Sequence, residues 1–516
     1  MYTLSDVAKK GATLFPEKVA MVFGDTRIRY RELNARVSRF ANALIGLGCK
    51  KGDRLTILSE NTYKYMEAYF AAARAGMSVT PLNFRLSDSE LVHIVNDSEA
   101  NVFLVGNGYE ERAYALKNDF KNIKKWISLD NGKDGYLSYE SLIEESPADD
   151  PCIHVYENDM AILMYTGGTT GLPKGVMLSH RNLLTAAYGL IISYSFSHRD
   201  TQCYILPLFH ISLWPVLCLL MVGGTVVILP RPDVQEILKT IEKEKCTKVL
   251  LVPTLIGWIM SEENLNTFDL SSLKAIQYAG SPMPLKLLKK CINKFGNIFI
   301  QGYGLTEAAP MLTTLNPEDH ILEGPKTKLL SSVGKEGVVV EVKIVDENDQ
   351  PVKPGHIGEI VGRGSNIMLG YWKNPELTKD TLRGGWLHTG DMGTICEDGY
   401  IYLVDRKADM IITGGENVYP KEVEDILYQH EAVQECIVTS APDSKWGERV
   451  QAAVVLKSGK QVSENELILH CKEGLAGYKC PKAIEFWEEL PKTPIGKLLR
   501  KDVREKFWKG RSKKIG

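Results

Sequence analysis

The chain has 516 residues, of which 44% are hydrophobic and 24% charged, the balance of an ordinary globular protein. Its 62 Lys and Arg residues against 64 Asp and Glu give a net charge of −2, which excludes the globally basic surface of a dedicated nucleic-acid-binding protein and the composition of an acidic disordered chain. At roughly 150 residues per domain, the length predicts about three domains or subdomains.

The ten cysteines do not form a metal or redox motif. No Cys-x-x-Cys pair exists, and the nearest two cysteines are Cys471 and Cys480. This pattern excludes zinc-ribbon and thioredoxin-type sites. Free thiols, and a start that lacks an apolar secretory signal, predict a cytoplasmic protein.

The first third of the chain alternates helix and strand patterns. Apolar residues at helical spacing from Tyr30 to Leu44 predict a helix that ends near Gly46 or Gly48. The further predicted elements are strand 54–59, helix 63–74, helix 87–96 and strand 102–105, with strands again at 248–252, 275–278 and 298–301. Strands that alternate with helices of this length indicate parallel βαβ units.

Residues 201–230 contain no Asp, Glu, Lys or Arg, and residues 211–230 reach the length of a membrane span. Pro215 and the pair Gly223-Gly224 interrupt this stretch, and the residues from Thr225 are β-branched. We therefore predict a buried helix, a turn and a buried strand. A peripheral contact of residues 211–222 with membranes is a second hypothesis.

The pattern of predicted elements changes after residue 333. Short apolar strands, beginning with 338–345, alternate with turn clusters, which predicts a small antiparallel barrel or sheet. Beyond residue 405, about 110 residues carry a compact βαβ-like pattern that suffices for a small domain.

The strongest motif is Tyr-Thr-Gly-Gly-Thr-Thr-Gly-Leu-Pro-Lys-Gly at 165–175, directly after the apolar strand 160–164. Its glycines and threonines expose backbone N–H groups and hydroxyls that can surround the oxygens of a polyphosphate, and Lys174 adds a cation. The loop is not a Walker A motif. A glycine-rich hairpin without function is the alternative.

Three weaker motifs follow. Gln-Gly-Tyr-Gly-Leu-Thr-Glu at 301–307 comes after a predicted strand, where α/β folds bind ligands, and suits a nucleobase beside a metal-holding acid; a plain turn is the alternative. The segment 384–391 ends in Asp391 after a Thr-Gly turn, and a carboxylate there can bind the hydroxyls of a ribose. The segment 491–500 presents Lys497, which alone would be a solvated charge.

In this order and spacing, the four motifs closely resemble those of the AMP-forming adenylate ligases, the superfamily of acyl-CoA synthetases, firefly-type luciferases and peptide-synthetase adenylation domains. The resemblance covers essentially the whole chain, and residues 405–420 and 441–448 resemble the fatty-acid and aryl-CoA ligase branch. It implies an α/β fold: a large N-terminal domain, 1–404, of doubly wound sheets plus a small β-barrel at about 333–404, a hinge at 405–408, and a small mobile α+β C-terminal lid domain at 409–516.

The resemblance also implies roles for individual residues. The implied ATP-binding residues are Thr166, Gly167, Gly168, Thr169, Thr170 and Lys174 at the phosphates, Gly280, Ser281, Gly302 and Tyr303 at the adenine, and Asp391 and Arg406 at the ribose. The implied catalytic residues are Lys497, Thr306 at the α-phosphate, Glu307, which also holds Mg²⁺, and His210 at the acyl pocket. The implied coenzyme A residues are Gly414, Gly415, Trp446, Tyr478 and Lys482. A buried core histidine is the alternative for His210.

The implied activity is ATP-dependent ligation of a carboxylic acid to coenzyme A. The carboxylate attacks the α-phosphorus of ATP, pyrophosphate leaves, and the thiol of coenzyme A then expels AMP from the acyl-adenylate. Mg²⁺, the loop N–H groups and Lys497 offset the repulsion between the two anions. Because Lys497 serves only the first half-reaction, the lid domain is expected to rotate about the hinge, where Ala408 replaces the Asp or Lys common in relatives.

The substrate is predicted to be a fatty or related apolar acid, because no acidic residue lies between Asp200 and Asp233 to hold an amino group. Trp214 and Tyr188 either close a short aromatic pocket or gate a long alkyl tunnel. The alternatives are an adenylation enzyme that passes its acyl group to a carrier-protein thiol, and a non-enzymatic binding protein. The sequence does not indicate an oligomeric state.

Overall fold

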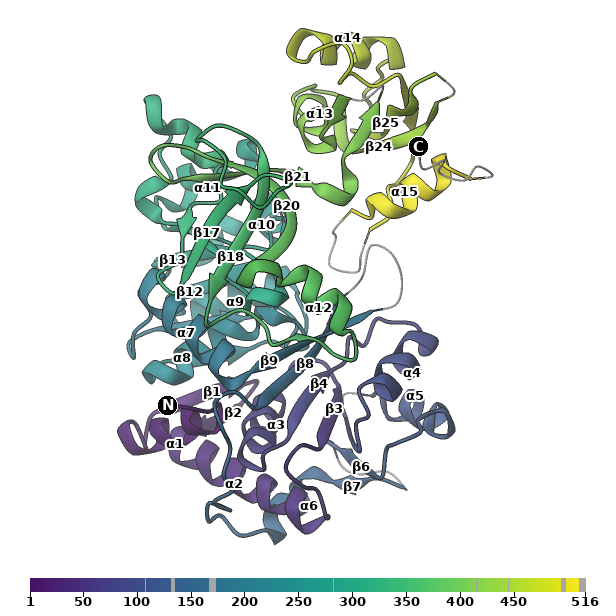
Figure 1. Ribbon diagram of the computed structural model, residues 1–516. Helices are drawn as coiled ribbons and strands as arrows, with labels where there is room; N and C mark the ends of the chain where they lie inside the picture. The colour runs from purple at the N-terminus through teal and green to yellow at the C-terminus, as the bar shows by residue number, and fades with distance from the viewer. Residues whose placement is uncertain are drawn as a thin grey trace. The chain divides into compact units, whose positions relative to one another are not determined.

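The computed structural model describes residues 1–106, 108–130, 135–166, 173–281, 283–413, 416–443, 445–492 and 498–509, although the side chain of Ala408 is not among the described parts (Figure 1). The chain divides into two compact units. Unit 1 comprises Met1–Val342 and Val361–His388, and unit 2 comprises Lys343–Ile360 and Thr389–Gly516. The hinge predicted at 405–408 and the domain bounds tied to it stay predictions.

The first sheet of unit 1 has eight strands in the order β19-β9-β8-β4-β3-β5-β6-β7. These are β19 (Gly370–Tyr371), β9 (Lys174–Ser179), β8 (Met160–Thr166), β4 (Ser78–Pro81), β3 (Arg54–Leu58), β5 (Val102–Val105), β6 (Lys125–Ser128) and β7 (Leu137–Ser138). The strands from β8 to β7 are parallel, whereas β9 is antiparallel to both of its neighbours. The expected βαβ units are therefore present.

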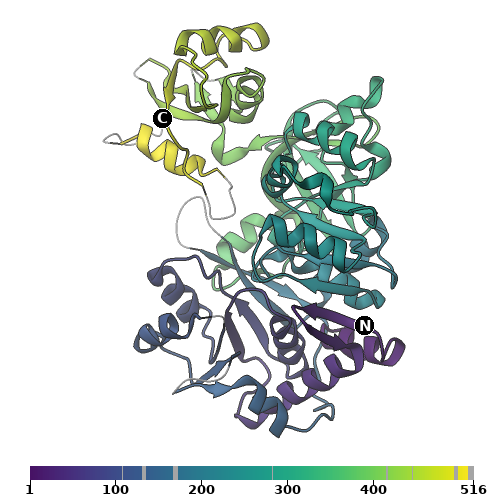
Figure 2. The ribbon, with the colours of Figure 1, turned by 180° about the vertical axis from the view of Figure 1, so that it is seen from behind.

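Helices cover both faces of this sheet. They are α1 (Ser5–Leu14), α2 (Tyr30–Gly46), α3 (Tyr63–Arg74), α4 (Asp88–Asp97), α5 (Glu110–Ala115) and α6 (Tyr139–Glu145). Seen from opposite sides in Figure 1 and Figure 2, α4 and α5 lie together, away from α2 and α6. Leu91 and Ile94 of α4 share a core with Phe103 of β5. On the other side, Arg36 of α2 forms an ion pair with the fully buried Glu67 of α3.

The second sheet of unit 1 has nine strands in the order β16-β15-β14-β13-β12-β10-β11-β1-β2. These are β16 (Lys335–Glu336), β15 (Thr313–Leu315), β14 (Phe299–Tyr303), β13 (Ala275–Tyr278), β12 (Lys248–Leu251), β10 (Thr201–Tyr204), β11 (Thr225–Ile228), β1 (Val19–Phe23) and β2 (Thr26–Arg29). The strands from β14 to β1 are parallel, and antiparallel strands close both edges. Their carboxyl ends therefore share one edge of the sheet.

Five helices accompany the second sheet: α7 (His180–Ser193), α8 (Trp214–Val222), α9 (Val234–Lys243), α10 (Pro253–Ser261) and α11 (Leu285–Phe295). Ile237 of α9, Ile256 of α10 and Leu288 of α11 form one core with Val249 of β12. Lys248 precedes Val249 and faces the opposite side of the strand, where its ammonium donates to the carbonyl oxygen of Tyr194 after α7. The sheet is thus packed on both faces.

The helix, turn and strand predicted within residues 201–230 are confirmed. The apolar residues form α8, Gly223 ends it in the left-handed conformation with φ of 80°, and β11 follows. Residues 214–221 are buried, and the peripheral membrane contact expected of residues 211–222 stays a hypothesis. Within the described parts of the chain, no helix has both the length and the apolar character needed to cross a membrane.

Where the sequence predicts a small barrel or sheet, the chain forms a four-stranded sheet in the order β17-β18-β20-β21. These strands are β17 (Val340–Val345), β18 (Gly358–Gly364), β20 (Leu387–Ile395) and β21 (Ile401–Arg406), and α12 (Pro375–Thr381) lies between β18 and β20 in the chain. Strands β20 and β21 are antiparallel. The first three strands run through the division between the two units.

The remaining part of unit 2 has its own sheet, β23-β22-β25-β24, with β26 beside β25. Its elements are β22 (Ile411–Thr413), β23 (Glu416–Val418), α13 (Pro420–Leu427), β24 (Val433–Asp443), β25 (Gly447–Leu456), α14 (Glu464–Gly474), β26 (Ala483–Phe486) and α15 (Arg500–Phe507). Only the β25–β26 pair is parallel. The βαβ-like prediction missed the long β24–β25 hairpin because both strands are buried along most of their length, which removes the alternation that marks a hairpin.

A buried histidine makes the stability of unit 1 depend on pH. His180 begins α7, is 1% exposed, and its Nδ1 accepts a hydrogen bond from the backbone N–H of Leu4 at 3.3 Å. Burial lowers the pKa of His180 to about 4. The unfolded chain binds a proton at this residue below about pH 6.5 but the folded chain only below about pH 4, so the free energy of unfolding falls as the pH falls between these values.

We therefore expect the wild type to lose about 3 kcal/mol of unfolding free energy between pH 7 and 4 through this group alone. Urea denaturation of the wild type and of His180→Asn, at pH 7, 5.5 and 4.5, measures the loss as a difference between the two proteins. Asn can place its side-chain oxygen near the position of Nδ1 to accept the hydrogen bond from Leu4, and it does not titrate. Parallel pH profiles of the two proteins would contradict the assignment.

Candidate functional site

The glycine-rich motif lies in the chain between the antiparallel strands β8 and β9 of the first sheet. Thr166 at the end of β8 pairs with Lys174 at the start of β9, so both ends of the loop are fixed by the same ladder. Gly167, Gly168, Thr169 and Thr170 lie outside the described residues, as do Gly414, Gly415 and Lys497 of the other motifs.

The second motif forms the end of β14 and a short 3₁₀ turn, Thr306–Ala308, in which Thr306 is buried. Backbone and side chains from 366–371 hold this turn. The backbone N–H of Met368 donates to the carbonyl oxygen of Glu307 at 2.9 Å. The amide Nδ2 of Asn366 donates to the carbonyl oxygens of Ala308 at 2.8 Å and Met311 at 2.9 Å. The backbone is therefore fixed at Glu307 and at the residues that follow it.

Tyr371 connects the first two motifs. Its hydroxyl donates to Oε1 of Glu307 at 2.8 Å, and the ammonium of Lys174 lies 5.8 Å from the centre of its ring. Burial, and secondarily the charge of Glu307, raises the pKa of Tyr371 far above its ordinary value, so the phenol stays a hydrogen-bond donor. The sequence did not identify Tyr371, since nothing near it marks a partner 64 residues earlier.

Gly280 and Ser281 follow β13, while Gly302 and Tyr303 end the neighbouring β14. Tyr278 pairs in parallel with Gln301, so the two pairs lie at the same edge of the second sheet. Gly280 has φ of +86°, a conformation that favours glycine. The four residues expected at the adenine are thus neighbours in space.

An aromatic cluster lies behind Gly302. A Cβ on Gly302 would lie 2.4 Å from the hydroxyl oxygen of Tyr194, whose ring packs edge-on against Trp214 at 5.2 Å. Phe196 is the second aromatic neighbour of Trp214. Tyr188, which the sequence suggested together with Trp214, is 40% exposed, and its role at a pocket or tunnel stays a prediction. Tyr194 caps α7 one position after Ser193, and the sequence did not mark it because helix periodicity does not extend past a helix end.

This geometry predicts that a smaller residue at position 194 compensates for a larger one at position 302. We expect Gly302→Ala to lower kcat/KM about 10-fold, because the added methyl displaces Tyr194 or the strand carrying the motif. Adding Tyr194→Phe removes the oxygen in the way and should restore at least half of the lost activity, measured as pyrophosphate release. Tyr194→Phe alone is the control. A double variant that is as impaired as the single one would contradict a direct clash.

His210 lies in the loop between β10 and α8 and is exposed, which excludes the core-histidine alternative. Its Nδ1 accepts a hydrogen bond from the backbone N–H of Ser212 at 3.3 Å.

Asp391 and Arg406 form a pair within unit 2. They are directly opposite each other on β20 and β21, and their side chains form an ion pair at 3.1 Å. The carboxylate of Asp391 is 11% exposed, and the backbone N–H of the same residue donates to Oγ1 of Thr389 at 3.0 Å. A carboxylate held in this way can accept hydrogen bonds from hydroxyl groups.

The three described coenzyme A candidates also belong to unit 2. Trp446 precedes β25 and is 48% exposed, while Tyr478 lies between α14 and β26 and is 41% exposed. Lys482 precedes β26, and its ammonium donates to the carbonyl oxygen of Gly477 at 2.8 Å. Cys480 is buried, so it belongs to the core of this unit rather than to a binding surface.

The acidic residue expected at Mg²⁺ fits the ion. In the described chain, the Glu307 carboxylate is held by a hydroxyl rather than by a cation, so its charge is not neutralised by its neighbour. The described residues contain no cluster of three or more His, Cys, Asp or Glu side chains that could enclose a metal. Proteins commonly bind Mg²⁺ through one or two carboxylates together with substrate phosphates, and Glu307 suits that mode.

Two family models and several full-length relatives match this chain. Residues 8–372 match the AMP-binding enzyme family, and residues 422–497 match the AMP-binding enzyme C-terminal domain. The chain is 38% identical over 500 residues to a feruloyl-CoA synthase of Amycolatopsis sp., covering 96% of this chain and 97% of that relative. It is 33% identical over 546 residues to a long-chain-fatty-acid–CoA ligase of Salmonella typhimurium, covering 98% and 94%.

The structure also resembles o-succinylbenzoate CoA synthetase (MenE) from Bacillus subtilis, solved in complex with its acyl-adenylate intermediate. The TM-score is 0.84 and the identity 33%, with 96% of this chain and 97% of that chain covered. The α/β fold expected from the sequence is thereby confirmed. With family matches over both units and full-length relatives above 30% identity, the chain belongs to the AMP-binding enzyme family.

Proposed function

We propose that this protein ligates a fatty or related apolar carboxylic acid to coenzyme A. It is an AMP-forming acyl-CoA synthetase: ATP and the acid form an acyl-adenylate and pyrophosphate, and the thiol then displaces AMP. The observation that carries the proposal is that relatives matched along 94–97% of their length are named as CoA synthases or ligases, although their acids differ.

The candidate residues suit this chemistry. Lys174 and the backbone beside it would bind the phosphates, Thr306 the α-phosphate, and Asp391 the ribose hydroxyls. Glu307 would hold Mg²⁺, with Tyr371 fixing one carboxylate oxygen at 2.8 Å. Bound together with ATP, Mg²⁺ supplies positive charge that offsets the repulsion between the phosphates and the incoming carboxylate.

The apolar character of the substrate is supported by the surroundings of Gly302. The rings of Tyr194 and Trp214 lie behind this glycine, and both residues are buried. Residues 201–230, which supply β10, the His210 loop, α8 and β11, contain no Asp, Glu, Lys or Arg. A pocket bounded by this segment disfavours acids that carry a second charge.

We further propose that the enzyme works in the cytoplasm in fatty-acid or lipid metabolism. All ten cysteines are free, the state expected in a reducing compartment.

The test is pyrophosphate release with ATP and Mg²⁺ across ferulate, benzoate, octanoate and palmitate, each with and without coenzyme A. We expect sustained turnover only with coenzyme A, and the best acid defines the pocket. A single release of pyrophosphate per enzyme that coenzyme A does not extend would instead support a carrier-protein thiol as acceptor. No release with any acid would count against the ligase function.

A further inference from the structure

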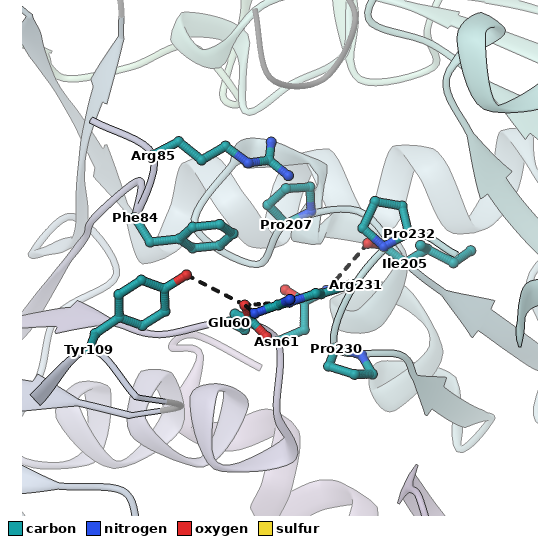
Figure 3. Close-up of a pocket in the computed structure, with 10 residues that line it drawn as sticks. All are labelled: Glu60, Asn61, Phe84, Arg85, Tyr109, Ile205, Pro207, Pro230, Arg231 and Pro232. Carbon is teal, nitrogen blue, oxygen red and sulfur yellow. Dashed lines mark hydrogen bonds and ion pairs between the residues drawn. The ribbon is translucent and has the colours of Figure 1, made fainter. Parts of the chain in front are cut away.

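A cavity of about 320 Å³ lies where the two sheets of unit 1 meet at the carboxyl ends of their strands (Figure 3). Glu60 and Asn61, which follow β3 of the first sheet, face Ile205 and Pro207 after β10 and Arg231 after β11 of the second sheet. The guanidinium of Arg231 forms an ion pair with Glu60. Residues from both sheets therefore line the cavity, and we call the contact between these residues the seam.

Asn61 makes the densest set of contacts that the structure records across this seam. Its side chain is 4% exposed. Its Nδ2 donates to the carbonyl oxygens of Leu206 at 2.9 Å, Leu229 at 3.1 Å and Ile205 at 3.4 Å. Its Oδ1 accepts from the backbone N–H of Leu208 at 2.8 Å. With two N–H donors, one of them shared between two carbonyl oxygens, and one acceptor oxygen, this side chain contacts four backbone groups of the opposite sheet.

Tyr69 supports the same loop, and we call the side chains of Asn61 and Tyr69 together the clasp. The hydroxyl of Tyr69 donates to the carbonyl oxygen of Leu208 at 3.2 Å, so the two side chains satisfy both backbone groups of Leu208. Both residues come from the β3–α3 segment and are buried. Leu208, in turn, is 0% exposed.

The clasp provides hydrogen-bond partners for backbone groups of residues 205–208 that lie outside the sheet. After Tyr204 the chain leaves β10, and residues 205–208 leave the sheet ladder, although Ile205 and Leu208 are buried and the two residues between them are half-buried. Buried backbone groups without partners cost about 1–3 kcal/mol each, so a loop in this position needs donors and acceptors from elsewhere. An amide side chain can both donate and accept, and Asn61 supplies both functions at one point.

The held segment leads directly to His210. The backbone N–H of His210 donates to the carbonyl oxygen of Pro207 at 3.1 Å, and the hydroxyl of Ser212 donates to the same oxygen at 3.4 Å. Fixing residues 205–208 therefore fixes the turn that carries His210. We propose that Asn61, assisted by Tyr69, is a positioning residue that holds the His210 loop at the acyl site; this rests on the proposed function and on the place of His210 within it.

The first test is Asn61→Asp, which keeps the size of the side chain and the acceptor for Leu208 but removes the donors to three carbonyl oxygens. We expect kcat/KM for the acid to fall by a factor of about 10 to 100, since small displacements of positioned groups cost this much. KM for ATP should change less than about 2-fold, because the phosphate motifs are held separately. Tyr69→Phe, which removes one bond, should show a smaller loss of the same kind.

A double-mutant cycle distinguishes positioning from general damage. In a His210→Ala background, Asn61→Asp should lower kcat/KM by less than about 3-fold, because the group it positions is already absent. Full additivity of the two losses would overturn the proposal. The matched control is Asn42→Asp: Nδ2 of Asn42 donates to the carbonyl oxygens of Pro147 at 2.9 Å and Asp149 at 2.8 Å, away from the site, and its loss should leave kcat/KM unchanged.

Hydrogen exchange gives a readout that does not need activity. Backbone amides of residues 205–212 should exchange at least 10-fold faster in Asn61→Asp, and faster in Tyr69→Phe, than in the wild type or Asn42→Asp. Unchanged exchange in both clasp variants would refute the clasp itself. If the wild type ligates no acid, the proposed function fails, while the exchange result still decides whether Asn61 holds the loop.

Discussion

Replacing Lys497 with alanine is expected to lower acyl-adenylate formation by a factor of about 10² to 10³, and to change the reaction of a supplied acyl-adenylate with coenzyme A by less than about 3-fold. In the first half-reaction a carboxylate anion must approach the negatively charged α-phosphate, whereas in the second the thiol attacks the acyl carbon and AMP leaves. An ammonium between the carboxylate and the α-phosphate offsets the repulsion of the first step and is not needed for the attack of the thiol.

Single-turnover pyrophosphate release measures the first step, and CoA-ester formation from synthetic acyl-adenylate measures the second. Lys497 lies outside the described residues, so its role rests on the resemblance of segment 491–500. Lys492 in the same segment is the matched control: its ammonium forms an ion pair with Glu435 at 2.8 Å, and Lys492→Ala should leave adenylation within about 3-fold of the wild type. Equal loss of both steps in Lys497→Ala would contradict a lysine that serves one half-reaction.

The regular elements of unit 1 could be read from the sequence because their local signals agree with the fold. Helix 63–74 and strands 102–105 and 275–278 have the predicted bounds, since apolar periodicity and flanking glycines act within a few residues. The β24–β25 hairpin could not be read in the same way. Its register joins Val433 to Leu456 across a buried pair of strands, and burial on both faces leaves no alternating pattern.

The candidate site also has a part that local sequence predicts and a part that it does not. The motifs identify the segments that form the site, because the glycines, hydroxyls and charges that bind nucleotides cluster within a few positions of the sequence. The contacts that fix those segments are long-range: Tyr371 lies 64 positions from Glu307, and Asn61 lies 147 positions from Leu208. The partner in each of these hydrogen bonds is determined by the tertiary fold, so neither Tyr371 nor Asn61 carries a local signal.

The contact between Tyr371 and Glu307 leads to the second large effect. Glu307→Gln keeps the shape of the side chain and an oxygen that can accept from Tyr371, but it removes the negative charge. We expect it to lower adenylation about 100-fold at a fixed Mg²⁺ concentration and to raise the Mg²⁺ concentration for half-maximal rate at least 10-fold, because carboxylate oxygens bind Mg²⁺ far better than an amide does. Titration of the adenylation rate with Mg²⁺ measures both quantities.

Tyr371→Phe separates the charge of Glu307 from its orientation. The charge remains, but the 2.8 Å hydrogen bond is lost, and losing such an outer contact typically costs about 10- to 100-fold in metal affinity or activity. We expect a rise of about 10-fold in the Mg²⁺ requirement, and a much smaller effect when the change is added to Glu307→Gln, because an amide has less charge to orient. Tyr136→Phe, which loses a hydroxyl bond to the carbonyl oxygen of Glu110 outside the site, is the control. If Tyr371→Phe impaired the rate equally in both backgrounds, the phenol would act on the turn or on Lys174 rather than through the carboxylate, and the Mg²⁺ requirement would stay at the wild-type value.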